Sequence, residues 1–169
     1  MPPTPAATTA EKPADPAFVN YRQLAELLRD PAGKDKFLRR MVADKSILRL
    51  APDSSFDPLV NVAILYDRTS WILPELLAAP SLLRMPNGES KSSKRALGLC
   101  GIHRYGLFNQ LDVVAPVIDK DPSLLELVTN NGKTAIDLCS HKGMREHFTT
   151  VLTVYRAKLS AAPPAADLS

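Results

Sequence analysis

The chain has 169 residues, of which 45% are hydrophobic and 23% charged, and its formal net charge is +3. This balance is typical of one globular domain with its own core, and the charge is too small to indicate nucleic acid as a partner. The two cysteines exclude a disulfide scaffold, so we expect an intracellular protein, cytoplasmic or nuclear, while import into an organelle or delivery into a host cell stays open.

The two ends of the chain are rich in proline and alanine. Residues 1–16 lack the apolar centre of a signal peptide and the arginines of a transit peptide. No apolar run approaches the ~18–20 residues that span a bilayer. We expect disordered tails at 1–16 and 160–169, because they contain few side chains able to build a core, and one folded domain at 17–159.

The first part of that domain, residues 17–50, predicts a helix pair, either a true repeat or a cap. Two apolar stripes at helical spacing are separated by the Pro31–Gly33 break. They consist of Phe18, Tyr21, Leu24 and Leu28, and of Phe37, Leu38, Met41 and Val42.

One phrase then occurs three times. It reads KSILRLAPDSSFDPL at 45–59, PSLLRMPNG at 80–88 and PSLLELVTNNGKTAIDLC at 122–139. Successive copies lie 35 and 42 residues apart, and the first overlays the third without a gap. Such periods are typical of solenoids of helix pairs. We therefore predict repeats at 51–86, 87–128 and 129–159.

Each repeat shows two helical segments with a break between them. The first has its break near Asp67–Ser70 and the second near Tyr105–Gly106, where the preceding helix includes Leu97–Cys100. Pro74 and Pro116 fall in the second helices, although a proline in a helix interior costs about 3 kcal/mol.

The last repeat has the clearest helix signals. Thr134 and Asp137 form a T-x-x-D capping pattern at the start of a short helix. We expect Gly143 to end that helix in the left-handed conformation. A second helix follows, with one apolar stripe from Phe148 to Leu159.

The stretch TAIDLCSHKGMREHFTTVL at 134–152 resembles the ankyrin repeat, whose usual phrase is T-P-L-H-x-A followed by a glycine and a second helix. The resemblance extends, with less agreement, over 45–118, where Val60, Gly98 and, in the last repeat, Asp137 replace the usual histidine. It implies an all-α fold, a short ankyrin-like helical-repeat solenoid of about four helix pairs. It also implies a protein that binds other proteins through its fingers and concave face, without a cofactor.

Two cysteines each have a histidine close by in the sequence, and the four residues Cys100, His103, Cys139 and His141 are of the types that bind zinc. Their C-x2-H and C-x-H spacings are not those of familiar zinc sites. We interpret both cysteines as small residues at the same repeat position, packed between helices. Asp137 and His141 are four residues apart and are interpreted as a cap or local ion pair. We predict no catalytic, cofactor-binding or metal-binding residue.

Charge alternates along the last two repeats. It is +3 over 87–106, −3 over 107–128 and positive again over 129–145, which predicts a basic concave face and an acidic back; the alternative is ordinary solvated surface. The polar GESKSSK insertion at 88–94 is either a loop that contacts a partner or an insertion that is tolerated without such a role. The predicted partner contacts are Asn87, Glu89, Lys91, Lys94, Arg104, Asn131, Lys133 and Lys142.

The predicted function is a non-catalytic protein–protein interaction module, an adaptor or scaffold subunit that binds an acidic partner surface. Four short units are close to the minimum of about three repeats for a stable array, which favours membership of a larger assembly. The alternatives are a nucleic-acid-binding module that uses the same basic face, and a Cys/His metal-binding or catalytic protein. Nucleic acid is disfavoured because the lysines are not interleaved with aromatic residues.

Overall fold

A computed structural model describes residues 15–88, 98–108 and 110–161. Within these ranges the elements are helical, which confirms the all-α prediction for the described part of the chain. The described residues form eight α-helices and four 3-10 helices, and their extended backbone pairs only in an isolated bridge between Pro86 and Cys100.

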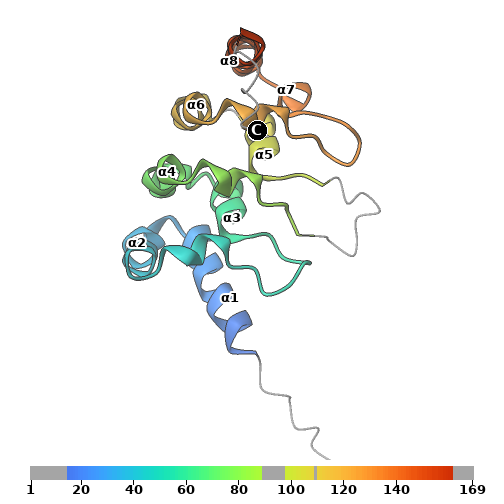
Figure 1. Ribbon diagram of the computed structural model, residues 1–169. Coiled ribbons are helices and arrows are strands. Elements are labelled where there is room, and N and C mark those ends of the chain that lie inside the picture. Colours follow the sequence, from blue (N-terminus) through green and yellow to red (C-terminus); the bar gives the residue numbers. More distant parts are fainter. Residues whose placement is uncertain (1–14, 89–97, 109, 162–169) are drawn as a thin grey trace, which may run out of the picture.

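The α-helices follow one another in four pairs along the chain (Figure 1). The inner helices are α1 (Pro16–Arg29), α3 (Leu59–Leu65), α5 (Gly101–Leu107) and α7 (Ala135–Leu138). The outer helices are α2 (Lys34–Ala43), α4 (Thr69–Ala78), α6 (Leu111–Lys120) and α8 (Lys142–Ala161). Short 3-10 helices are η1 (Pro31–Gly33), η2 (Lys45–Arg49), η3 (Pro80–Arg84) and η4 (Pro122–Glu126).

The pairs are stacked so that the inner and outer helices form two columns (Figure 1). In the inner column α1 contacts α3, α3 contacts α5 and α5 contacts α7; in the outer column α4 contacts α6 and α6 contacts α8. The Phe37 ring of α2 and the Trp71 ring of α4 lie 6.5 Å apart between centroids and join the first two outer helices. Each pair therefore contacts its neighbours in the chain, as in repeat proteins.

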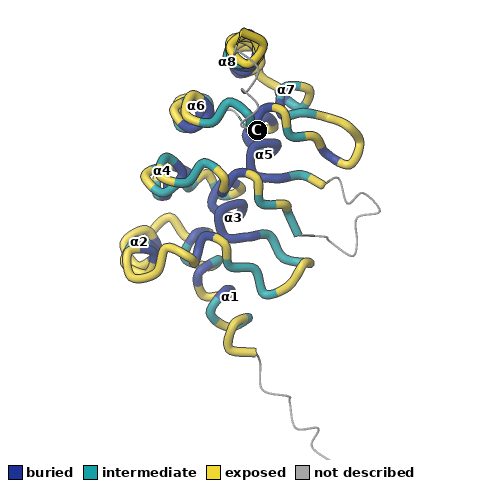
Figure 2. Tube along the Cα trace, in the orientation of Figure 1, coloured by how far each residue is buried: buried dark blue, intermediate teal, exposed yellow. Residues whose placement is uncertain are grey.

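The repeated phrase of the sequence is the 3-10 helix that follows an outer helix. Its two central residues are buried in every copy: Ile47 and Leu48, Leu82 and Leu83, Leu124 and Leu125. Burying one such side chain contributes about 1.5–3 kcal/mol relative to its exposed state. The buried residues continue through the inner helices and make one core along the stack (Figure 2).

The third pair differs from the sequence prediction. Its inner helix starts at Gly101, so Leu99 and Cys100 do not belong to it, and Tyr105 and Gly106 lie inside α5 instead of at a break; Leu97 lies outside the described residues. Gly98 has φ +59°, a left-handed conformation that cannot continue an α-helix. The helix therefore begins after Gly98.

Other predictions at helix ends were also wrong. Gly143 is the second residue of α8, and the helix it was expected to end stops at Leu138. Val42 on α2 is 79% exposed and Leu159 on α8 is 55% exposed, so both lie outside the buried stripes to which they were assigned. The folded part extends past both predicted boundaries, since Asp15 caps α1 and α8 continues to Ala161. Residues 1–14 and 162–169, where the tails were predicted, lie outside the described residues.

Candidate functional site

Three segments lead from a 3-10 helix to the next inner helix, and we call them finger 1 (50–58), finger 2 (85–100) and finger 3 (127–134). Their described parts lie on the side of the inner column opposite to the outer helices (Figure 1). Residues 89–97 of finger 2 lie outside the described residues. The predicted contacts Glu89, Lys91 and Lys94 fall there, and for them the prediction stays a prediction.

Asn87 and Arg104, two of the predicted contacts, meet inside the molecule. Arg104 Nε on α5 donates to Asn87 Oδ1 at 3.0 Å, and its Nη2 pairs with the Asp57 carboxylate. The same Asn87 oxygen accepts from Asn61 Nδ2 at 2.8 Å. The Arg104 side chain is only 13% exposed. These groups join the base of finger 2 to α3 and α5, so they position the fingers from within.

Asp57, at the end of finger 1, lies at the centre of this network. Its Oδ1 accepts from the backbone N–H of Gly88 at 2.8 Å, and its backbone oxygen accepts from the Tyr21 hydroxyl at 2.8 Å. Burial, and next the negative charge of Asp57, raise the pKa of Tyr21 to about 12. One acidic residue thus connects α1, finger 2 and, through Arg104, α5.

The third residues of α3, α5 and α7 are Asn61, His103 and Asp137. Asn61 Nδ2 donates to Met85 O at 3.1 Å, and His103 Nε2 lies 3.0 Å from Leu127 O. Because His103 Nδ1 accepts from the Cys100 backbone N–H at 3.1 Å, Nε2 is the nitrogen that carries the proton. Burial lowers the pKa of His103, so this internal bridge is neutral at pH 7.

The equivalence of these three helix positions corrects the sequence alignment of the repeats. The residues equivalent to Asp137 are Asn61 and His103, not Val60 and Gly98. Finger 1 is one residue longer than finger 3, so a gapless overlay misplaces α3 by one position. Asp137 itself behaves as predicted: it forms a capping box with Thr134, in which Thr134 N donates to Asp137 Oδ2 at 2.8 Å. Those hydrogen bonds lower the pKa of Asp137.

Asn131 and Lys133 lie exposed in finger 3. The finger closes through Thr129, whose N–H donates to Lys133 O at 2.8 Å and whose hydroxyl accepts from Lys133 N at 3.0 Å. Gly132 between them has φ +71°, the conformation that glycine adopts without strain. The turn therefore presents two predicted contact side chains to solvent on a fixed backbone.

Lys142 does not lie with the other predicted contacts. It is the first residue of α8 in the outer column, exposed, with its Nζ 3.7 Å from Glu146. Arg145, on the same helix, donates to Cys139 O at 2.5 Å. With Arg104 paired internally, Lys133 is the one lysine or arginine on the described parts of the fingers. The predicted basic concave face is therefore not assembled from the described residues.

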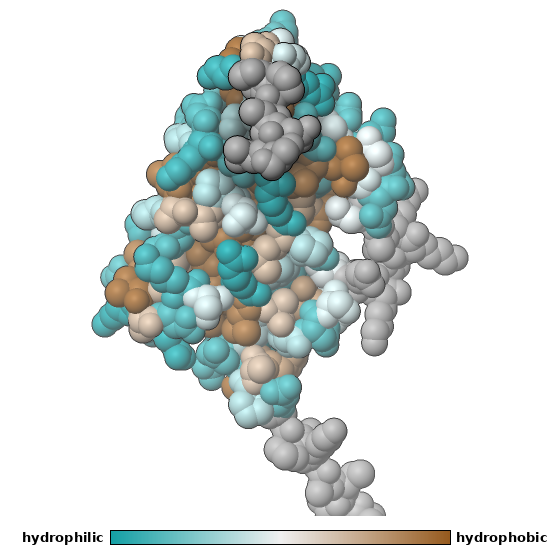
Figure 3. Space-filling view, viewed as in Figure 1, coloured by the Kyte–Doolittle hydropathy of each residue, from teal (hydrophilic) through white to brown (hydrophobic). Residues whose placement is uncertain are grey.

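Two of the four carboxylates of the predicted acidic back, those of Asp121 and Glu126, are paired with arginines. Arg84 on η3 pairs with Asp121 at 3.1 Å, and Arg156 on α8 pairs with Glu126 at 3.1 Å. Exposed pairs of this kind stabilise little, but they cancel the local charge. On the face seen in Figure 3 hydrophilic and hydrophobic residues are interspersed.

The cysteines and histidines do not converge on a metal site. Cys100 Sγ lies 3.1 Å from His103 Nδ1, but no group of three or more His, Cys, Asp or Glu side chains suited to a metal ion occurs among the described residues. Cys100 caps the start of α5 and Cys139 the end of α7, so they are not at one repeat position as predicted. Burial raises the pKa of both thiols, which keeps them protonated and poor ligands.

A groove between α1 and α2 is a feature that sequence reasoning missed. The sequence signal was the basic segment KDKFLRR at 34–40, which lies outside the stretch where the charges were compared. Asp57 was missed as well, because nothing in its sequence context indicates a partner 47 residues away.

None of the described helices is long and apolar enough to cross a membrane. Comparison of the chain with protein-family models, with curated proteins and with solved structures finds no match.

Proposed function

We propose that this chain is a non-catalytic protein–protein interaction module, built as a short ankyrin-like solenoid, and that its fingers bind an acidic surface of a partner. The observation that supports this most directly is that polar side chains at the finger bases form hydrogen bonds and an ion pair within the molecule. Asp57, Asn61, Asn87, His103 and Arg104 bond the bases to the inner helices. Fixed finger bases reduce the ordering cost of binding at the tips.

The tips are the proposed contact regions. Finger 3 presents Asn131 and Lys133, and finger 2 contributes Lys91 and Lys94 from its polar insertion. Their lysines suit a partner with clustered carboxylates, because complementary charge raises association rates and suppresses wrong partners. In this proposal the chain performs no chemical step.

The test is affinity purification of the tagged chain from the cells that produce it, with quantitation of what co-purifies. The finger variant carries Lys91→Glu, Lys94→Glu and Lys133→Glu. A matched control carries Lys34→Glu, Lys120→Glu and Lys158→Glu, the same charge change on the outer helices. A stoichiometric protein that is lost only from the finger variant is the expected result. A partner kept by both variants would exclude the fingers, and the absence of any partner would remove the proposal.

A further inference from the structure

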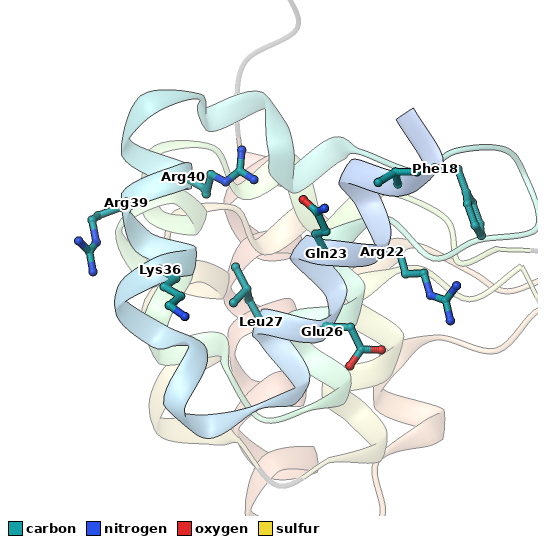
Figure 4. A pocket seen from close by; sticks show the side chains of 9 residues that line it. Phe18, Arg22, Gln23, Glu26, Leu27, Lys36, Arg39 and Arg40 are labelled. Carbon is teal, nitrogen blue, oxygen red and sulfur yellow. The ribbon is translucent and has the colours of Figure 1, made fainter. Parts of the chain in front are cut away.

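An open groove of about 840 Å³ lies between α1 and α2, at the N-terminal end of the stack (Figure 4). Its apolar lining comes from Phe18, Val19 and Leu27, all on α1. Val19 is 40% exposed, whereas Tyr21, Leu24 and Leu28 of the same helix are buried in the stack. The groove has an apolar floor that no described element covers.

The rim of this groove is strongly basic. Arg22 on α1 and Lys36, Arg39 and Arg40 on α2 line it, against the single carboxylate of Glu26. In the described part of the chain, none of these four cations belongs to an ion pair. Arg39 Nε donates to the backbone oxygen of Asp35 at 3.2 Å, which leaves its charge uncompensated. The charges are therefore available to a ligand with carboxylates.

The lining residues have helical spacing on both walls. Val19, Gln23 and Leu27 follow one another at four-residue intervals on α1, and Lys36 and Arg40 do so on α2. One face of each helix thus borders the groove, and Figure 4 shows Leu27 and Lys36 directed into the space between the helices. Rows of side chains at this spacing accept a third helix by ridge-into-groove packing.

We propose that this groove binds an acidic amphipathic helix of a partner protein. The apolar face of that helix packs on Phe18, Val19 and Leu27, and its flanking carboxylates pair with the cations of the rim. This inference goes beyond the proposed function of the fingers, since α1 and α2 lie at the opposite end of the stack from finger 3 (Figure 1).

Other occupants fit the groove less well. Residues 1–14 and 162–169 carry one acidic side chain each, Glu11 and Asp167, and several prolines that oppose a helix. A second copy that docked groove to groove would bring the two basic rims together. Single-stranded nucleic acid would need an aromatic surface for stacking, but the Phe18 ring packs against Phe56 at 5.5 Å and 67°.

The probe for the test is a fluorescent peptide of about 18 residues with leucines on one helical face and glutamates along both edges. Its control has the same composition in scrambled order. We expect fluorescence anisotropy to give at least about tenfold tighter binding of the amphipathic peptide than of the scrambled one to the full-length chain. Equal binding of the two peptides would show that only their overall charge is recognised, and it would overturn the proposal.

Two sets of variants locate the contact. The variant with Lys36→Glu and Arg40→Glu should weaken peptide binding by at least about tenfold, and Val19→Ser by a few-fold, since Val19 is already part-exposed. The matched control with Lys120→Glu and Lys158→Glu should keep the wild-type affinity, as should the finger variant. Far-UV circular dichroism of each variant establishes that it is folded. Unchanged affinity in the rim variant would place the peptide elsewhere.

Two further outcomes also decide against the proposal. A duplex oligonucleotide that binds more tightly than the peptide, and loses affinity in the rim variant, would identify the groove as a nucleic-acid site. Light scattering that shows a dimer of the free chain, absent from the rim variant, would identify a second copy as the occupant. A monomer that prefers the peptide is the expected result, and it does not depend on what the fingers bind.

Discussion

The guanidinium of Arg104 pairs with the carboxylate of Asp57, and so α5 is tied directly to the finger that precedes α3. Both side chains are mostly buried, at 13% and 22% exposure. A partly buried charge that loses its partner keeps its desolvation cost without compensation.

Asp57→Ala is therefore expected to lower the free energy of unfolding by about 2–4 kcal/mol. It leaves Arg104 without its counter-ion and the Gly88 N–H without its acceptor. Urea denaturation followed by circular dichroism measures the change. Asp112→Ala, an exposed position on α6, serves as the control. A double-mutant cycle with Arg104→Ala should give a coupling energy of about 1–3 kcal/mol, and additive losses would contradict a direct pair.

Substitution of His103 should depend on whether the new side chain can donate to Leu127 O. His103→Ala removes the donor and leaves a cavity, and we expect a loss of about 2–4 kcal/mol. His103→Asn should be milder by about 1 kcal/mol, because Asn61 makes the equivalent bond to Met85 O at 3.1 Å in the preceding repeat. Equal losses in the two variants, measured by urea denaturation, would show that the hydrogen bond to Leu127 does not matter.

His103 also predicts a loss of stability in mild acid. Burial places its pKa in the folded chain below the unfolded value of about 6.5. As the pH falls through that unfolded value, the unfolded chain binds more protons than the folded one, and the free energy of unfolding decreases. Urea midpoints between pH 7.5 and 5 should therefore fall less steeply for His103→Asn than for the wild type.

Two glycine-to-alanine changes should have opposite signs. A Cβ on Gly106 would lie 2.5 Å from the backbone oxygen of Ala135, so Gly106→Ala must separate α5 from α7 and should cost about 1–3 kcal/mol. A Cβ on Gly143 meets nothing within 4 Å, and this residue is helical. Gly143→Ala should therefore raise the free energy of unfolding by about 0.5–1 kcal/mol. Thermal denaturation of both variants tests the pair, and a destabilised Gly143→Ala would contradict the helical assignment.

The capping box of α7 gives a further test. Thr134→Ala removes the hydroxyl that accepts from Asp137 N at 3.3 Å and should lower stability by about 0.5–2 kcal/mol. Thr153→Ala, an exposed position within α8, should be neutral or slightly stabilising, because alanine is the better helix former. Comparison of the two urea midpoints separates a lost cap from a general effect of losing a threonine.

The sequence predicted what is local and repeated. The buried pairs of the 3-10 helices, the Thr134 cap, the helical stripe of α1 and that of α8 up to Tyr155 follow from spacing over a few residues. The start of α5 was missed because Ala96, Leu97 and Leu99 imitate the apolar start of an inner helix, while Gly98 adopts a left-handed conformation. Apolar spacing does not report the conformation of a single glycine.

The polar network could not be predicted for a different reason. Asp57, Asn87 and Arg104 come together only after the pairs are stacked, and each is unremarkable in its own segment. The contact predictions had the same weakness: they treated charges in sequence order as if they shared one face. Lys142 lies on the outer column because it is the first residue of α8, whereas Gly143 was expected to end the preceding helix.

The two 3-10 helices that follow α4 and α6 begin in nearly the same way, and this determines how the chain could be lengthened by duplication. The backbone before them has nearly the same conformation, with φ −139° and ψ 76° at Ala79 and φ −135° and ψ 78° at Asp121. A tandem duplication of residues 80–121 would therefore leave and rejoin the chain at matching geometry. The molecule could be lengthened by whole units of one finger and one helix pair, without changing how its ends are built.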